Sequence, residues 1–320
     1  MTSFFTGGLL AAALLLLRPV SLAAAGPGRA VWAWEEESYA MLERGSSAKE
    51  ALRFSGSKGI NTIYLYADSY KGRSLIEKKP ELYRKLIGRL HKGGMRVYAL
   101  LGSWHLHTED YVRPERRVEA LAMLKRVLDY NSAAGPLERF DGVNLDLEPH
   151  MLPEWKTDRD RLLLSFLDMG SEMMAMKKAA GAALKIGPAV PFWLDGIELE
   201  WDGRKKPVSE HVLDIYDYAA LMAYRDRAAG EDGLVALAAG ELKYAGAIGK
   251  EVVVGVEVTP NEIKKVSFDR KSEAEMEWEL LLAADALGKE PAFGGFAIHH
   301  FGSYRAWLRL WETPAGKRND

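Results

Sequence analysis

Short runs of strand-forming residues alternate with longer amphipathic segments along most of the chain. Several runs are almost continuously apolar, as expected of parallel strands buried on both faces. Eight such runs are present: 30–34, 61–67, 96–102, 140–148, 184–190, 216–224, 251–258 and 293–300. Helical periodicity marks the intervals 114–131, 160–181 and 272–287. The alternation predicts consecutive β/α units.

Eight β/α units fit a closed (β/α)8 barrel, a fold that takes about 250 residues or more. We therefore expect an α/β protein with a single (β/α)8 TIM-barrel domain over residues 26–320. An open doubly wound sheet is the alternative, although no Gly-x-Gly-x-x-Gly fingerprint follows the first strand.

The N-terminus has a different pattern. Residues 4–17 are an apolar run, and Ala23-Ala24-Ala25 supplies the small residues of a cleavage site. This predicts a secretory signal peptide over residues 1–25 and a secreted or periplasmic protein. No Lys or Arg precedes the run, and Arg18 follows it. An uncleaved anchor is the alternative, but the run is short for a membrane span of about 20 residues.

Composition and charge narrow the classes of partner. The formal net charge is −2, which gives no overall field that favours nucleic acid. The chain contains no cysteine, so disulfides and a thiolate nucleophile are excluded. After signal cleavage we expect neither a nucleic-acid nor a membrane partner, and the sequence carries no indication of oligomeric state.

Acidic residues gather at the end of the fourth predicted strand, in FDGVNLDLEPH (140–150). Asp146 and Glu148 are two positions apart, which places them on one face of a strand, about 7 Å apart. Asn144 lies on the same face. Because barrel enzymes carry their active sites at the carboxyl ends of the strands, these side chains are candidates for catalysis. A solvated loop is the alternative, and the spacing is too open for a calcium-binding loop.

DGVNLDLE resembles the D-G-x-D-x-D-x-E signature of family 18 glycoside hydrolases, the chitinase-like barrels. The match places Asp141, Asn144, Asp146 and Glu148 on the signature positions. ALMAYR (220–225) is similar to that family's Met-x-Tyr segment and places Tyr224 on its tyrosine. The resemblance implies that Glu148 protonates the glycosidic oxygen, and that Asp146 and Tyr224 position the substrate's 2-acetamido group.

The chain departs from the family pattern at three places. Asn144 stands where the signature has an aspartate, and Arg225 stands where the family has an acid after the tyrosine. The last strand ends in AIHHFGSY rather than with a tryptophan. The departure at Asn144 keeps a second hypothesis open, a carbohydrate-binding barrel with little or no catalysis.

Glu257 ends the seventh predicted strand, which faces the fourth across a barrel mouth. Many retaining barrel glycosidases use one glutamate from each of these strands, with carboxyl groups about 5–5.5 Å apart. Glu148 and Glu257 are therefore an alternative catalytic pair. A salt-bridged rim residue is the other interpretation of Glu257.

Aromatic and imidazole side chains end or follow almost every predicted strand. Aromatic faces of this kind pack against sugar rings. The candidates are Trp32, Trp34, Tyr64, Tyr66, Trp104, His105, Trp193, His299 and His300. Arg225 is a further candidate, either for an acidic sugar or to neutralise Asp146 or Glu257. His105, His107, His299 and His300 with Asp146 would be needed for a metal hydrolase, but we expect neither metal nor cofactor.

Together these features predict an exported glycoside hydrolase. The expected substrate is a β-linked glycan that contains N-acetylhexosamine, cleaved by acid/base catalysis from the end of the fourth strand.

Overall fold

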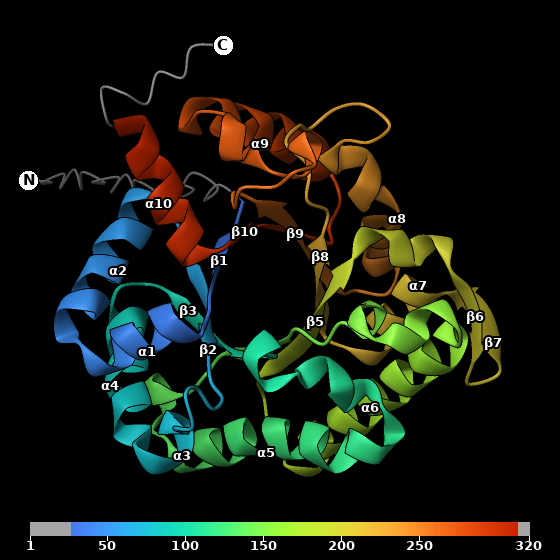
Figure 1. Cartoon of the computed structure of the whole chain (residues 1–320), viewed down its shortest axis with the longest axis horizontal. Coiled ribbons are helices and arrows are strands. Elements are labelled where there is room, and N and C mark those ends of the chain that lie inside the picture. The colour runs from blue at the N-terminus through green and yellow to red at the C-terminus, as the bar shows by residue number, and fades with distance from the viewer. Residues whose placement is uncertain (1–26, 313–320) are drawn as a thin grey trace, which may run out of the picture.

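The computed structural model describes residues 27–312, which form a closed barrel of eight parallel strands inside a ring of helices (Figure 1). The predicted signal peptide, residues 1–25, lies outside the described residues. The barrel strands are β1 (Arg29–Ala33), β2 (Thr62–Tyr66), β3 (Arg96–Leu101), β4 (Gly142–Leu145), β5 (Lys185–Pro191), β8 (Tyr218–Met222), β9 (Glu251–Glu257) and β10 (Phe293–His299). They follow one another around the barrel, and β10 pairs with β1 to close it. The predicted (β/α)8 fold is confirmed.

The helices cover the outside of the barrel (Figure 1). They are α1 (Glu35–Glu43), α2 (Gly45–Ser57), α3 (Leu75–Lys78), α4 (Pro80–Lys92), α5 (Arg117–Ala133), α6 (Arg159–Ala179), α7 (Val208–Ile215), α8 (Leu234–Ala247), α9 (Glu273–Leu287) and α10 (Phe301–Glu312). Ser272 caps α9 in a capping box with Glu275, as its position before an acidic first turn favours. Within residues 27–312, no helix has the length and apolar character needed to cross a membrane.

One element stands outside the regular alternation. β6 (Glu198–Trp201) and β7 (Arg204–Pro207) form an antiparallel hairpin between β5 and α7, and it does not join the barrel sheet. Four of its residues are charged and exposed, so the strand pattern there is weak.

The barrel interior is filled by large aromatic side chains. Trp32, Tyr64, Tyr98 and Tyr218 belong to one buried cluster, with ring centroids 5.2 Å apart for the first pair and 5.6 Å for the last pair. The expectation that Trp32 and Tyr64 would line the mouth is therefore wrong. Each residue precedes the end of its strand, at a depth where packed side chains fill the barrel interior.

The end of β4 sets the position of the acidic segment. The ladder ends at Leu145 rather than at 148, and the last bond of this edge runs from the Asp146 N–H to the Leu101 carbonyl over 2.7 Å. Gly102 follows with φ +130°, and a Cβ there would collide with the Asp146 carbonyl oxygen. Because Gly102 has no side chain, β3 and β4 stay in close contact up to the acidic residues.

Candidate active site

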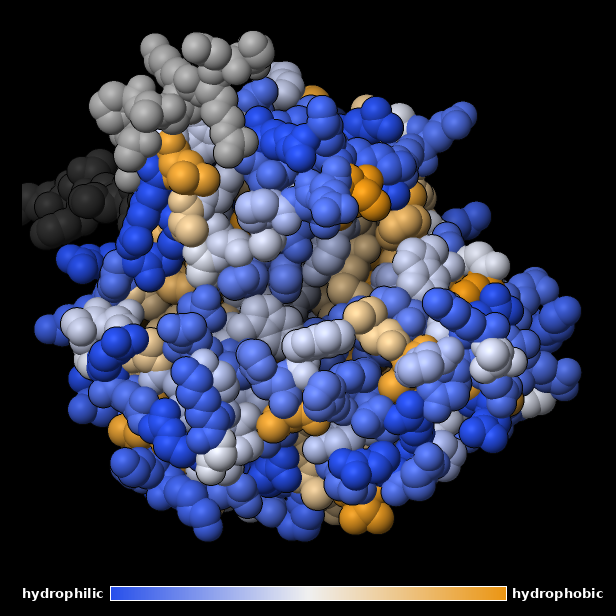
Figure 2. All heavy atoms as spheres, viewed as in Figure 1, coloured by the Kyte–Doolittle hydropathy of each residue, from blue (hydrophilic) through white to orange (hydrophobic). Residues whose placement is uncertain are grey.

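A cavity of about 350 Å³ opens at the carboxyl ends of β1, β3, β4 and β10. Figure 2 shows this face of the molecule hollowed near its centre, with mostly hydrophilic residues on the surrounding rim. Seven of the predicted site residues line the cavity: Trp34, Trp104, His105, Asp146, Glu148, His299 and His300. The structure therefore brings together residues from four strand ends that are far apart in the sequence.

Asp146 and Glu148 share this cavity but differ in their surroundings. The pKa of Asp146 is raised well above its usual range, first by burial and then by the negative charges of Glu148 and Glu35. Its Oδ1 atom is buried and has no hydrogen-bond partner among the described residues. Both side chains are partly exposed. The raised pKa means that Asp146 can hold a proton near neutral pH.

Glu35 is a third acid in the cavity, and the sequence did not mark it as a candidate. It follows β1 as the first residue of α1 and is buried. Its Oε1 atom accepts a hydrogen bond of 2.5 Å from the hydroxyl of Ser103, the residue after Gly102. The acidic triplet Glu35-Glu36-Glu37 resembles an exposed helix start, so only its place in the fold singles out Glu35.

Glu148 is held by a histidine that the sequence also did not select. Nε2 of His150 lies 3.0 Å from Oε2 of Glu148. The imidazole packs edge-on against Trp155 and Trp193, with ring centroids 6.1 Å and 5.2 Å away. Trp193 thus contacts the site through His150 and supports the position of the Glu148 carboxyl group.

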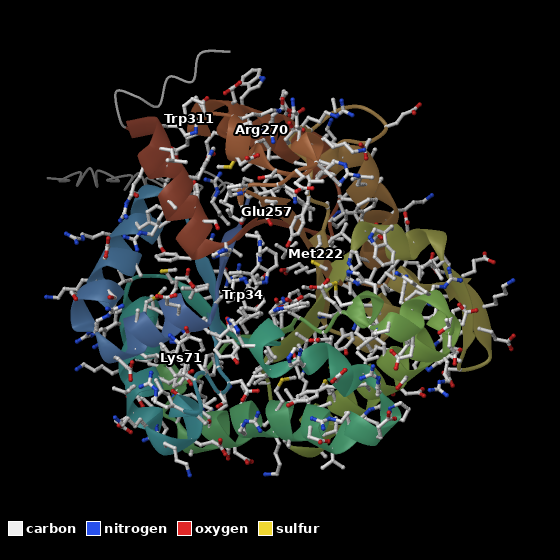
Figure 3. All side chains as sticks on the ribbon, in the orientation of Figure 1. Trp34, Lys71, Met222, Glu257, Arg270 and Trp311 are labelled. Atoms are coloured by element: carbon white, nitrogen blue, oxygen red, sulfur yellow. The ribbon has the colours of Figure 1, made fainter. Side chains whose placement is uncertain are left out.

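His299 connects the cavity to Glu257. Its Nδ1 lies 2.8 Å from Oε2 of Glu257, and its Nε2 lies 3.0 Å from Nε1 of Trp34. Since an indole N–H can only donate, Nε2 must accept, and Nδ1 carries the hydrogen that is donated to Glu257. Figure 3 shows Trp34, Glu257 and Met222 around the centre of the barrel.

Glu257 itself is buried and fully engaged. Besides His299, the backbone N–H groups of Val258 and Thr259 donate to its Oε1 over 2.8 Å and 2.6 Å. Burial alone would raise its pKa, but the bonds from His299 and Thr259 outweigh burial and lower it. Glu257 therefore acts as a fixed anion that orients His299.

His300 remains neutral at ordinary pH. Burial, with a smaller contribution from His299, lowers its pKa to about 4. Its Nε2 lies 2.9 Å from the Ser303 hydroxyl, and its Nδ1 lies 3.7 Å from Glu37. It is suited to hydrogen bonding rather than to proton transfer near pH 7.

Asn144 lies below the cavity, with no exposed surface. Its Oδ1 accepts from the Trp32 indole over 2.8 Å, and its Nδ2 donates to the Gly187 carbonyl and to the Tyr218 hydroxyl over 3.4 Å and 3.3 Å. Tyr218 donates in turn to the Val143 carbonyl. The site needs a donor and an acceptor on one side chain, which an amide supplies and a carboxylate does not.

Tyr224 packs against His299 at the end of β8, near the acidic side chains of the site. Its ring centroid is 5.8 Å from that of His299. Burial, followed by the charges of Glu257, Asp146 and Glu148, raises its pKa well above the usual value. The hydroxyl therefore stays protonated and can donate a hydrogen bond into the site.

Arg225 points away from the catalytic candidates. It forms an ion pair with Asp232 over 2.6 Å, and Asp232 also binds Lys265 from the loop after β9. The expectation that Arg225 neutralises Asp146 or Glu257 is not met, because its carboxylate partner is Asp232. Tyr66 is fully buried and donates its hydroxyl to the Ser69 carbonyl, so in this structure it does not reach the cavity.

The remaining histidines are separated from one another. His105 packs near Tyr70, with ring centroids 6.3 Å apart, and Nδ1 of His107 lies 3.3 Å from Glu109. Among the residues that the structure describes, no three or more His, Cys, Asp or Glu side chains are grouped in a way that could hold a metal ion. Trp104 is 65% exposed at the cavity rim, where a flat ring can meet a ligand.

Solved structures with a similar fold include chitinases and a mannosidase. The ICChI chitinase from Ipomoea carnea superposes over 88% of this chain and 97% of its own, with a TM-score of 0.50 and 13% identity. A family 18 chitinase from Cycas revoluta, solved with (GlcNAc)3, gives the same coverage, TM-score and identity. The exo-β-1,4-mannosidase Op5Man5 from Opitutaceae bacterium strain TAV5 covers 86% of this chain and 52% of its own, with a TM-score of 0.55 and 12% identity.

These likenesses establish a chitinase-like barrel fold. No family model matches the sequence. Among curated proteins, exonuclease subunit 1 of Enterobacteria phage T4 is 30% identical over 107 residues, 33% of this chain. The chain spans about a third of the length of that relative, since the match covers 31% of it.

Proposed function

We propose that this protein is a glycoside hydrolase that cleaves a β-linked glycan containing N-acetylhexosamine, with Glu148 as the general acid and base. The observation that carries the proposal is that Asp146 and Glu148 line one cavity, where burial and then the charge of Glu148 raise the pKa of Asp146 well above its usual range. Two neighbouring carboxyl groups in different surroundings are a recurrent arrangement for proton transfer at neutral pH. The chitinase-like fold and the resemblance of DGVNLDLE to the family 18 signature support it.

The proton can be followed through one cycle. At rest, Asp146 holds the proton. When an acetamido group enters the site, the proton moves from Asp146 to Glu148, and the resulting Asp146 carboxylate accepts a hydrogen bond from the acetamido N–H. Glu148 then gives the proton to the glycosidic oxygen while the acetamido carbonyl oxygen attacks the anomeric carbon. Water opens the cyclic intermediate and returns a proton to Glu148.

The surrounding residues fit this sequence of steps. The Tyr224 hydroxyl, which stays protonated, can donate to the acetamido oxygen. Trp34 and Trp104 offer flat faces to sugar rings at the cavity wall and rim. We further propose that the protein is exported by residues 1–25, and that the mature barrel acts in the periplasm or outside the cell.

A matched pair of substrates tests the proposal. Oligosaccharides of N-acetylglucosamine and their de-N-acetylated counterparts are offered to residues 26–320, and products are separated by mass. We expect cleavage of the acetylated set alone, lost in Glu148→Gln by at least about a hundredfold. Glu290→Gln removes an exposed carboxylate before β10, at the other end of the barrel, and should leave cleavage unchanged.

The other outcomes have distinct meanings. Cleavage of both sets would remove the acetamido group from the mechanism. Binding of both without cleavage, unaffected by Glu148→Gln, would replace the hydrolase proposal with a carbohydrate-binding barrel.

A further inference from the structure

Among the acids that line the cavity, Glu35 is the most deeply buried one that the proposed steps do not use. It has an exposed fraction of 8%, lies at the junction of β1 and α1, and lines the same cavity as Asp146 and Glu148. A carboxyl group is rarely buried without a partner, because removal from water costs several kcal/mol. Glu35 follows β1 and Asp146 follows β4, and the fold brings both carboxyl groups to one cavity. We therefore ask how Glu35 acts on Asp146.

The chain places Glu35 and Asp146 on two sides of one short segment. Ser103 donates its hydroxyl to Oε1 of Glu35, and its own N–H donates to the Thr108 hydroxyl over 2.6 Å. The preceding residue, Gly102, packs directly against the backbone and Cβ of Asp146. The segment therefore holds the Glu35 carboxyl group at a fixed place beside Asp146.

The surroundings favour a negative charge on Glu35. It is the first residue of α1, a nine-residue helix whose N-terminal backbone dipoles stabilise an anion. The Ser103 hydroxyl adds a hydrogen bond to the carboxylate. Asp146 has no comparable support, since its buried Oδ1 has no partner within residues 27–312. Asp146 is therefore the group of this pair whose pKa is raised by its surroundings.

We propose that Glu35 is a positioning residue whose fixed negative charge keeps the proton on Asp146 between turnovers. This inference rests on the proposed function. Glu35 neither gains nor loses a proton in the cycle. The proton leaves an Asp146 oxygen for a Glu148 oxygen when substrate enters, and the charge of Glu35 draws it back to Asp146 when product leaves.

The other ionisable groups around the cavity are committed elsewhere. His299 is bound to Trp34 and Glu257, and His300 faces Ser303 and Glu37. Glu109 meets His107, and His105 packs near Tyr70. Glu148 contacts His150. Glu35 and Glu148 are the two charged groups that act on Asp146.

The test compares Glu35→Gln with Glu36→Gln. A glutamine at position 35 can still accept from Ser103, so only the charge is lost, whereas Glu36 is the exposed neighbour on the same helix turn. The protonated carboxyl band of Asp146, identified by its absence in Asp146→Asn, is followed by infrared spectroscopy across pH. We expect the band to disappear at a pH lower by about one unit or more in Glu35→Gln. It should be unmoved in Glu36→Gln and largely restored in Glu35→Asp.

Hydrolysis supplies the second readout. The basic limb of the pH–rate profile should move to lower pH in Glu35→Gln, with kcat affected more than KM. Equal titration of Asp146 in wild type and Glu35→Gln would overturn the inference. A shifted band in a protein without hydrolysis would support Glu35's role and reject the proposed function, so the two can fail separately. If Glu35→Gln does not fold, Glu35→Met removes the charge with little change in volume and serves in its place.

Discussion

The indole N–H of Trp34 donates to Nε2 of His299, and this bond fixes the tautomer of the histidine. Nδ1–H is thereby directed at Glu257, which two backbone N–H groups also hold. The arrangement looks at first like a catalytic Glu–His pair. Because Nε2 is occupied by Trp34, however, His299 has no free basic nitrogen to offer a substrate.

Glu257→Gln separates a structural anion from a nucleophile. The introduced amide can keep its oxygen toward the two backbone donors only by turning its NH2 toward Nδ1–H of His299. We expect a loss of about 2 kcal/mol in the free energy of unfolding, with hydrolysis reduced less than tenfold. Urea unfolding and initial rates measure both, with Glu262→Gln as the exposed control from the same loop. A loss of activity of a thousandfold or more would instead assign Glu257 as a nucleophile.

Asn144→Asp tests why an amide occupies the signature position. The aspartate keeps the acceptor for Trp32 but loses the donor to Gly187 and Tyr218, and it buries a charge. We expect a destabilisation of about 1–3 kcal/mol at pH 7, smaller near pH 4, where the carboxyl group is protonated. Denaturant unfolding at both pH values measures this. Asn261→Asp is the matched control, since within residues 27–312 the Asn261 side chain uses only its oxygen, toward the Ile263 N–H. Equal stability of Asn144→Asp and wild type would contradict the argument.

His150→Leu removes the hydrogen bond to Glu148 while keeping an apolar side chain between Trp155 and Trp193. Because the carboxyl group would lose its orientation rather than its chemistry, we expect kcat to fall about tenfold with little change in KM. Steady-state kinetics on the acetylated oligosaccharides decides this. Unchanged kcat would show that the contact at 3.0 Å has no part in positioning Glu148.

Glu241 on α8 should make stability depend on pH. It is buried, and neither carboxyl oxygen has a hydrogen-bond partner among the described residues. Burial, with a smaller contribution from Asp195, raises its pKa to about 8. The native state keeps a proton that the unfolded chain releases above its ordinary pKa of about 4.3. This group therefore lowers stability progressively as pH rises from there to about 8.

Glu241→Gln removes that dependence. Relative to wild type, the variant should gain stability between pH 5 and pH 8, at up to about 1.4 kcal/mol per pH unit. Urea unfolding at the two pH values measures the gain, and Glu231→Gln, an exposed acid before the same helix, should show none. A constant difference between Glu241→Gln and wild type at both pH values would contradict the prediction.

The barrel was predictable because its strands are apolar runs at regular spacing, and every predicted run overlaps an observed strand. The place of Asp146 and Glu148 at the barrel mouth was predictable because they follow a buried strand, and the active-site role of both remains a prediction. Glu35 was not, because its burial depends on a hydroxyl 68 positions away in the chain. The prediction put Trp32 and Tyr64 at the mouth because the alternation of residues along a strand shows which face a side chain is on. It does not show how far from the barrel mouth that side chain lies.

Asp232 joins two loops, because Arg225 after β8 and Lys265 after β9 both pair with it. The Asp226 N–H also donates to the Lys265 carbonyl, and Lys271 binds Asp226. These ion pairs and this hydrogen bond should make the loops after β8 and β9 move together as one rigid unit. Glycans of different width would then fit only if the opposite side of the mouth moves, which is the side that carries the exposed Trp104. The range of sugars that can bind would depend on how easily the Trp104 side of the mouth moves.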